Sequence, residues 1–319
     1  MKKLRIKFCD FWPSFHPDNN YFYNLLCTEY DVELSDEPEL LIYSCFGIEH
    51  LKYNCLRIFF TGENRRPDFR CCDFAMGFDF INDPRYFRLP LFALYIDQHP
   101  GYMEKLTQVQ TKEEALHNWR SKTKFCCMVV SNAKSKKRIN FFKKLSVYKQ
   151  VDSGGLVLNN VGGPVANKMD FIKDYRFVLA FENSEWPGYT TEKILEPFIS
   201  GSIPIYWGNP IIELDFNPGS FLHLKNAKSQ DDFIKAMLEV ENDESKALEI
   251  LMQPKFNDGK IPADIDKKRV LEFFQNIIQV KDSLELARTT NWKFLHQFYL
   301  KKYYYKRRFR RIVKNIFSS

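Results

Sequence analysis

Short apolar runs are the feature of this sequence that most constrains its fold. They are mostly continuous rather than alternating, and polar or glycine-containing segments follow them. Such runs form strands buried on both faces, as in parallel sheets covered by helices. The runs are LRIKFCDFW (4–12), LLIYSCF (40–46), CLRIFF (55–60), FCCMVV (125–130), FVLAF (177–181) and IPIYW (203–207).

Helical periodicity separates many of these runs, near residues 20–30, 136–147, 192–200, 229–240 and 267–280. Strands that alternate with helices predict an α/β protein. Since 319 residues exceed what one hydrophobic core usually organises, we expect two Rossmann-like domains. A glycine-rich stretch follows residue 150, so the predicted division is 1–150, 151–285 and a tail of 286–319.

The cysteines and the amino terminus indicate a reducing compartment. All eight cysteines precede residue 130, most of them within apolar runs and none in a CxxC spacing, so we expect reduced thiols, with a zinc site or a disulfide framework as the alternatives. The amino-terminal residues lack the hydrophobic run of a secretory signal, and no stretch approaches the roughly 20 apolar residues that span a bilayer. We therefore expect a cytoplasmic protein.

The segment FVLAFENSEWPGYTTEKILEPFISGSIPIYWGNP (177–210) places polar groups between two strand candidates. Glu182 follows the first strand, and Thr190 or Thr191 can cap a helix whose first turn contains Glu192 and Lys193. Free backbone amides and the Lys193 ammonium would then bind an anion such as phosphate, while Glu192 accepts hydrogen bonds from sugar hydroxyls. From spacing alone, a solvated surface pair between core strands explains the same residues.

The same segment closely resembles the signature of the α-1,3/4-fucosyltransferase family. The resemblance extends to TGEN (61–64), to Ser131, Asn132 and Arg138, and to DFNP (215–218), and it spans roughly residues 55–225. Within the signature the matching positions are Phe181, Glu182, Asn183, Ser184, Tyr189, Thr191, Glu192, Lys193, Pro204, Tyr206, Trp207 and Gly208.

The resemblance implies a GT-B glycosyltransferase, in which two Rossmann-like domains have parallel sheets facing a central cleft. It implies inverting transfer of fucose from GDP-fucose to a sugar hydroxyl, without a metal cofactor. Residues 1–150 would bind the acceptor and residues 151–285 the GDP-fucose. The expected acceptor is a GlcNAc-containing glycan such as N-acetyllactosamine, with O3 as the expected position and an α-1,4 linkage as the alternative.

The resemblance also assigns roles to individual residues. Glu63 matches the proposed catalytic base of the family, although an ordinary turn residue explains it too. Arg138 and Lys193 would offset the charge of the diphosphate. Glu192 would bind the ribose, and Asn183 and Tyr189 would approach the phosphates or the sugar. Glu182 is the second candidate for the base, or a group that stabilises positive charge on the fucose ring.

One Asp-x-Asp sequence, Asp264-Ile265-Asp266, would suit a metal-dependent glycosyltransferase. It precedes a lysine-rich helix rather than following a strand, and this context favours helix capping over a metal site.

The carboxyl-terminal tail is strongly basic. Residues 301–319 carry eight Lys or Arg of the net +7, so the remaining chain has a net charge of −1. Phe309, Ile312, Val313, Ile316 and Phe317 would form one apolar stripe on a helix, which favours an anionic membrane surface over nucleic acid or a disordered tail. We expect no nucleic-acid partner and a peripheral location on the inner face of the cytoplasmic membrane.

Two alternatives differ from the main hypothesis. The chain could be a GT-B glycosyltransferase that uses another nucleotide sugar, or a membrane-docked protein that binds a glycan or nucleotide without catalysis. Glu63 argues against the second alternative, because a binding protein needs no base.

Overall fold

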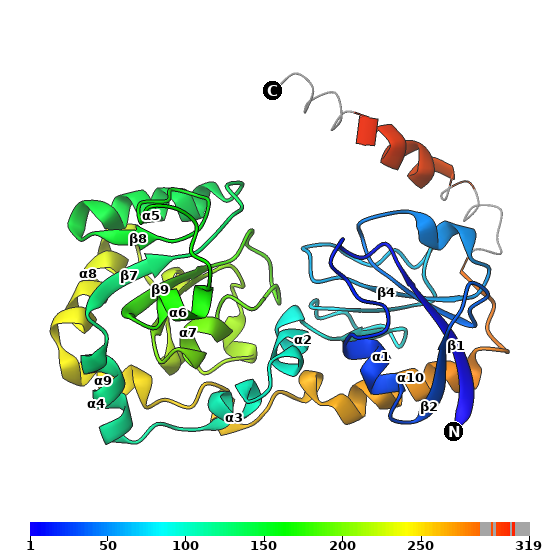
Figure 1. Ribbon diagram of the computed structural model, residues 1–319, viewed down its shortest axis with the longest axis horizontal. Helices are drawn as coiled ribbons and strands as arrows, with labels where there is room; N and C mark the ends of the chain where they lie inside the picture. The colour runs from blue at the N-terminus through cyan, green and yellow to red at the C-terminus, as the bar shows by residue number, and fades with distance from the viewer. Residues whose placement is uncertain (288–294, 296–297, 307, 310–319) are drawn as a thin grey trace. The chain divides into compact units, whose positions relative to one another are not determined.

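The structure is a computed structural model that describes residues 1–287, 295, 298–306 and 308–309 (Figure 1). The chain forms two compact units, one of Met1–Leu89 with Asp264–Ser319 and one of Pro90–Ala263. Each unit contains a parallel sheet with helices packed against it, which confirms the predicted α/β class.

Within the described residues, the first unit has a six-stranded sheet in the order β2-β1-β3-β4-β5-β6. Its strands are β1 (Lys2–Cys9), β2 (Tyr30–Leu34), β3 (Leu40–Tyr43), β4 (Leu56–Phe60), β5 (Phe74–Gly77) and β6 (Tyr86–Arg88). Its helices are α1 (Tyr21–Leu26) and α10 (Lys267–Val280), with the 3-10 turns η1 (Glu49–Lys52) and η6 (Ala263–Ile265), and residues 298–306 are also helical.

Neighbouring residues of the first sheet face opposite ways. Phe60 packs against Phe22 of α1, with ring centroids 4.9 Å apart, and Phe22 contacts Phe274 of α10 at 6.1 Å. Figure 1 shows α10 running beside α1. Phe59 points to the other face, where it joins a buried cluster that includes Cys9 and Tyr43. Continuous apolar strands are therefore required, because both faces of the sheet are covered.

Within the described residues, the second unit has a five-stranded parallel sheet in the order β11-β10-β9-β7-β8. Its strands are β7 (Lys124–Met128), β8 (Val151–Ser153), β9 (Tyr175–Phe181), β10 (Ile203–Trp207) and β11 (Leu222–His223). Its helices are α2 (Leu91–Gln98), α3 (Tyr102–Thr107), α4 (Lys112–Ser121), α5 (Lys136–Tyr148), α6 (Lys168–Ile172), α7 (Leu195–Ile199), α8 (Gln230–Asn242) and α9 (Glu244–Leu251). Short 3-10 turns are η2 (Ile212–Leu214), η3 (Pro218–Ser220), η4 (Leu224–Asn226) and η5 (Asn257–Gly259).

Aromatic residues join the helices of the second unit to the centre of its sheet. Phe141 of α5 lies 5.0 Å from Phe181 of β9 and 5.8 Å from Phe233 of α8, measured between ring centroids. Trp119 of α4 contacts Phe177 at 5.9 Å. These contacts fix β9, so the residues that follow it start from a rigid position.

The predicted boundary near residue 150 is wrong. The strand β7 and the helix α5 precede it, yet β7 pairs with both β8 and β9 in the second sheet. The glycine-rich stretch after residue 150 begins with β8 of the same sheet, so it is a loop within one unit rather than a linker. The chain also returns to the first unit at Asp264, so the boundary at residue 285 differs as well.

The eight cysteines are free thiols, and six of them are buried. Burial raises the pKa of Cys71 to about 11, which keeps this thiol protonated at neutral pH. Both findings agree with the expectation of reduced structural cysteines.

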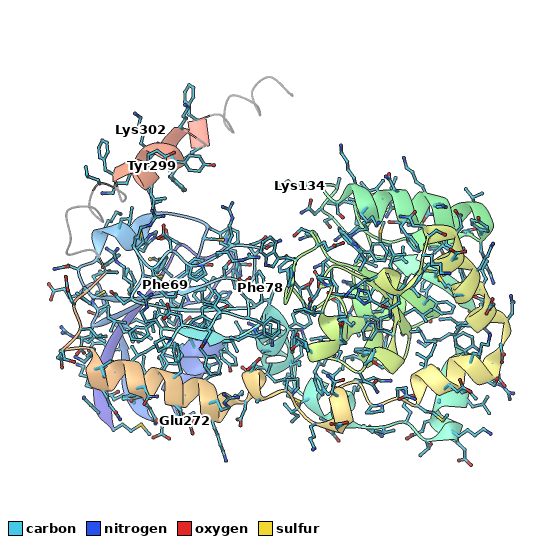
Figure 2. The ribbon with its side chains drawn as sticks, turned by 180° about the vertical axis from the view of Figure 1, so that it is seen from behind. Phe69, Phe78, Lys134, Glu272, Tyr299 and Lys302 are labelled. Carbon is cyan, nitrogen blue, oxygen red and sulfur yellow. The ribbon has the colours of Figure 1, made fainter. Side chains whose placement is uncertain are left out.

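Part of the basic tail lies within the described residues. Residues 298–306 are helical, and Tyr299 and Tyr303, one turn apart, are 63% and 55% exposed. Figure 2 shows Tyr299 and Lys302 on this helix. Phe309 is exposed, whereas the predicted stripe positions Ile312, Val313, Ile316 and Phe317 lie outside the described residues. None of the helices in the described part of the chain is long and apolar enough to cross a bilayer.

Candidate functional site

Several charged side chains gather at the carboxyl end of β9 in the second unit. Glu182 follows the strand directly, and its backbone N–H donates to the Trp207 carbonyl of β10 at 2.8 Å. Glu192 and Lys193 lie in the turn that precedes α7. We call Glu182, Glu192 and Lys193 the charged centre.

The Glu182 carboxylate is completely enclosed. Its Oε1 accepts the Thr191 N–H at 2.8 Å, and its Oε2 accepts the Thr191 hydroxyl at 2.8 Å. Lys193 Nζ lies 3.4 Å from Oε2, while the Glu182 side chain is 0% exposed. Burial raises the pKa of Glu182, and the nearby Lys193 charge opposes that effect. This geometry makes Glu182 a support for Thr191 and Lys193.

Lys193 joins the two carboxylates of the charged centre. Its Nζ donates to Thr191 Oγ1 at 2.9 Å and to Glu192 Oε1 at 3.0 Å. Burial acts to raise the pKa of Glu192, but the charge and hydrogen bond of Lys193 outweigh it and lower that pKa. Burial acts to lower the pKa of Lys193, and the two carboxylates raise it above its ordinary value. The side chains of Lys193 and Glu192 are 14% and 25% exposed, so both reach solvent.

The predicted helix start differs from the structure. The helix α7 begins at Leu195, and residues 192–194 form a turn that leads into it. The Thr191 N–H is not free for an anion, because Glu182 accepts it. The Thr191 N–H therefore does not contribute to an anion site, and the Lys193 ammonium is a partly exposed cation at this point.

Gly208 and Asn209, which follow β10, complete the support of the charged centre. A Cβ atom on Gly208 would lie 2.4 Å from Glu182 Cγ, and Gly208 has φ +151°, so glycine is required. Asn209 Oδ1 accepts the Gly188 N–H at 2.8 Å, and its Nδ2 donates to Thr190 Oγ1 at 3.0 Å. The sequence reasoning gave Asn209 no role, although its place directly after a strand and a glycine is a usable signal.

Arg138 is buried beside the charged centre at the start of α5. Its Nε and Nη2 donate to the Phe181 carbonyl at 3.2 and 2.6 Å, and Nη2 also donates to Asn183 Oδ1 at 3.0 Å. Nη1 donates to the Asn132 carbonyl at 3.3 Å. Arg138 is 1% exposed, so in this structure its guanidinium holds the end of β9 and orients Asn183. Tyr189 is also buried, at 2% exposure.

Glu63 belongs to the first unit and not to the group around Lys193. It is exposed in the loop after β4, and its backbone N–H donates to the buried Thr61 hydroxyl at 3.0 Å. The structure thus brings together six of the predicted site residues, namely Arg138, Glu182, Asn183, Tyr189, Glu192 and Lys193, in one unit and leaves Glu63 in the other.

The Asp264-Ile265-Asp266 sequence has structural partners. Asp266 caps α10 by accepting the Lys268 N–H at 2.9 Å, as its context predicted. Asp264 forms an ion pair with Arg88 at 2.7 Å. Among the described residues, no three His, Cys, Asp or Glu side chains are grouped so that they could hold a metal ion.

Comparison with known proteins gives matches over both units. Residues 6–95 match the alpha-(1,3)-fucosyltransferase FucT N-terminal domain, and residues 119–251 match the C-terminal part of glycosyltransferase family 10 (fucosyltransferase). The alpha-(1,3)-fucosyltransferase FucT of Helicobacter pylori is 31% identical in a match that covers 82% of this chain and 62% of that protein. The chain thus spans less than two thirds of the length of this relative and of others that it matches.

Solved structures agree with these matches. A crystal structure of an alpha1,3-fucosyltransferase superposes with a TM-score of 0.76 at 29% identity, covering 87% of this chain and 90% of that chain. The crystal structure of an alpha1,3-fucosyltransferase with GDP-fucose gives a TM-score of 0.73 at 28% identity, covering 88% of this chain and 91% of that chain.

Proposed function

The chain belongs to glycosyltransferase family 10, the fucosyltransferases, and on this basis we propose that it transfers L-fucose from GDP-fucose to a GlcNAc-containing glycan. The observation that carries the proposal is the partly exposed Lys193, held between Glu182 and Glu192 at the end of β9. A similar protein was crystallised with GDP-fucose, which supports this donor over another nucleotide sugar.

The proposed reaction is a single displacement. The acceptor hydroxyl oxygen bonds to the anomeric carbon of fucose while the bond from that carbon to the diphosphate oxygen breaks. GDP leaves with the electron pair, and the hydroxyl proton moves to the Glu63 carboxylate. The product has an inverted anomeric configuration, with an α-1,3 linkage to GlcNAc as the expected outcome and α-1,4 as the alternative.

Residues of the second unit would bind the donor. The Lys193 ammonium is the cation that stabilises the departing diphosphate, and Glu192 accepts hydrogen bonds from the ribose hydroxyls. Arg138 orients Asn183 toward the phosphates or sugar, and Tyr189 completes this side of the site. Glu182 positions Lys193 and is disfavoured as the base, because an enclosed carboxylate has no surface for an acceptor hydroxyl.

We further propose that the transfer needs no metal, because the partly exposed Lys193 ammonium supplies positive charge where a metal would otherwise be needed. One experiment tests donor, linkage and metal together. The protein is incubated with GDP-fucose and N-acetyllactosamine or lacto-N-biose, with and without a chelator, and the product linkage is determined by NMR.

The outcomes separate the alternatives. A fucosylated product formed equally well with chelator supports the proposal. Activity that the chelator abolishes and manganese restores contradicts the metal-free mechanism. Turnover with a different nucleotide sugar identifies another glycosyltransferase, and GDP binding without transfer to any acceptor identifies a binding protein.

We also propose that residues 301–319 hold the protein on the inner, anionic face of the cytoplasmic membrane. Exposed tyrosines beside lysines on the helix of residues 298–306 are the composition of a helix at a membrane interface. Truncation after Leu300 should abolish sedimentation with phosphatidylglycerol vesicles and leave fucosyl transfer intact. Neutral phosphatidylcholine vesicles are the control, and a truncated protein that still sediments with anionic vesicles would refute this assignment.

A further inference from the structure

An aromatic cluster lies at the carboxyl edge of the first sheet, outside the site in the second unit. Phe11, Trp12 and Phe15 follow β1, and Phe46 follows β3. Phe11 and Phe15 are stacked with ring centroids 3.9 Å apart. Trp12 meets Phe11, Phe15 and Phe46 edge to face, at 5.5, 5.4 and 6.4 Å. We call these four residues the aromatic cluster.

The aromatic cluster packs against a buried residue on one side and is partly exposed to solvent on the other. Phe8, the buried residue near the end of β1, contacts Phe15 at 5.4 Å and Phe11 at 6.0 Å. The rings of the cluster are half-buried except that of Phe46, which is 43% exposed. Large apolar rings that pack on buried residues on one side and are exposed to solvent on the other are typical of a ligand-binding surface rather than of a core.

A buried hydrogen bond between Asp10 and His50 makes the base of the cluster rigid. Asp10, with φ 59°, accepts the backbone N–H groups of Glu49 and His50 at 2.8 and 3.0 Å, and its Oδ2 lies 2.6 Å from His50 Nδ1. The Phe46 N–H donates to the Asp10 carbonyl at 2.9 Å. A Cβ on Gly47 would lie 2.0 Å from Asp10 Oδ1, so the loop after β3 can approach Asp10 closely because it has glycine there. The loops after β1 and β3 are thus fixed to each other.

The same edge of the sheet carries Glu63. The strands β3 and β4 are neighbours, and the Sγ of Cys45 lies 3.3 Å from Thr61 Oγ1. Thr61 Oγ1 in turn accepts the Glu63 N–H at 3.0 Å. Phe46 and Glu63 therefore stand on adjacent loops that share hydrogen-bonded contacts.

We propose that the aromatic cluster binds a neutral pyranose ring of the acceptor glycan and holds it beside Glu63. The inference rests on the proposed function, which needs an acceptor hydroxyl at Glu63. The faces of aromatic rings carry partial negative charge, and the C–H groups on the apolar face of a pyranose carry partial positive charge, so the two attract each other. The four side chains carry no charge, which suits a neutral sugar better than a phosphorylated one.

Steady-state kinetics with GDP-fucose and N-acetyllactosamine test the proposal. Trp12→Ala and Phe46→Ala should each raise KM for the acceptor roughly threefold to tenfold, the loss of one aromatic contact. KM for GDP-fucose should not change, and Trp12→Phe should restore most of the acceptor affinity. Tyr148→Ala is the matched control, because Tyr148 is an aromatic residue 49% exposed on α5 in the other unit.

Saturation-transfer NMR with N-acetyllactosamine gives a readout independent of turnover. Saturating the aromatic protons should produce signals on the sugar ring protons, and these should weaken in Phe46→Ala. Phe46 is exposed on its loop, so this variant is expected to fold even if Trp12→Ala does not.

The results distinguish the two proposals. Wild-type transfer with unchanged acceptor KM and unchanged sugar signals in Phe46→Ala and in the folded Trp12 variants would overturn the aromatic cluster and leave the proposed function standing. Absence of fucosyl transfer by the wild type would contradict the proposed function, while the NMR signals would still report whether the cluster binds the sugar. Sugar signals that persist unchanged in Phe46→Ala would count against the cluster in either case.

Discussion

Replacing Lys193 by methionine tests the charged centre most directly. The ammonium lies 3.4 Å from Glu182 and 3.0 Å from Glu192, so one cation serves two carboxylates. Methionine keeps an unbranched side chain of similar size but leaves both carboxylates without their cation. Breaking a buried ion pair costs about 3 to 5 kcal/mol, and we expect the lower end, about 3 kcal/mol of unfolding free energy at neutral pH, because Lys193 is 14% exposed.

The pH dependence of this loss has a defined sign. In the wild type, Lys193 lowers the pKa of Glu192 from its ordinary value of 4.5, so this residue stabilises the fold at neutral pH and loses that contribution in acid. Without Lys193, burial should raise the pKa of both carboxylates above the unfolded value. The folded variant then binds more protons than the unfolded chain, so its unfolding free energy should rise as the pH falls from about 7 to about 5.

Urea unfolding followed by tryptophan fluorescence at several pH values measures both effects. Lys246→Met is the matched control, because Lys246 pairs with Glu239 at 3.1 Å while the two side chains are 47% and 65% exposed. That exposed pair should contribute less than about 1 kcal/mol. The reasoning fails if Lys193→Met loses no more stability than Lys246→Met, or if the unfolding free energies of the Lys193 variant and the wild type change by the same amount between about pH 7 and about pH 5.

Three further predictions concern other residues. Glu63→Gln should lower kcat roughly 100-fold, as expected for loss of a general base, with an unchanged melting temperature because Glu63 is exposed; near-normal turnover would remove it from this role. In Arg138→Lys the fork of hydrogen bonds is lost, because a lysine cannot bond both the Phe181 carbonyl and Asn183. Calorimetry should then show weaker GDP binding, and denaturation should show an unfolding free energy lower by about 1.5 to 3 kcal/mol. If both values are unchanged, the assignment is contradicted. Burial lowers the pKa of His50 below 6.5, although Asp10 opposes this effect. The neutral His50 therefore stabilises the fold above about pH 6.5, and this contribution to the unfolding free energy is lost as the pH falls. His50→Asn keeps a donor for Asp10 without titrating, and it should therefore show a smaller loss of stability between about pH 7 and about pH 5 than the wild type; equal losses would exclude His50 as the cause.

The strands β1, β3, β4, β7, β9 and β10 were predictable because burial on both faces leaves a direct mark in the sequence. The short strands β5, β6, β8 and β11 were missed, because each has only two to four residues. The runs at 55–60 and 203–207 became β4 (Leu56–Phe60) and β10 (Ile203–Trp207) almost residue for residue. The strand β2 (Tyr30–Leu34) was missed, because it lies at the sheet edge and its residues are half-buried or exposed. An edge strand needs no continuous apolar run, so the pattern used for the other strands does not detect it.

The candidate site was predictable in its location but not in its internal bonding. Parallel strands end at one edge of their sheet, which is why Glu182 and Lys193 could be expected together. The enclosure of Glu182 depends on its hydrogen bonds to Thr191 and on the absence of a side chain at Gly208. Neither feature produces a periodic pattern in the sequence from which it could be predicted. The burial of Arg138 was also missed, because a cluster of cations in the sequence normally indicates a solvated surface.

The order of the units along the chain has a consequence for synthesis. Residues 90–263 leave the ribosome as one continuous unit, whereas the first sheet must wait for Phe274 and the rest of α10 to cover Phe22. Until then the ring of Phe22 lacks part of its final apolar cover, although every described strand of that sheet has already been made. Synthesis of the first unit therefore starts before that of the second unit but is completed after it. A fragment that stops before residue 267 would lack α10, and it would expose an apolar face that is prone to aggregation.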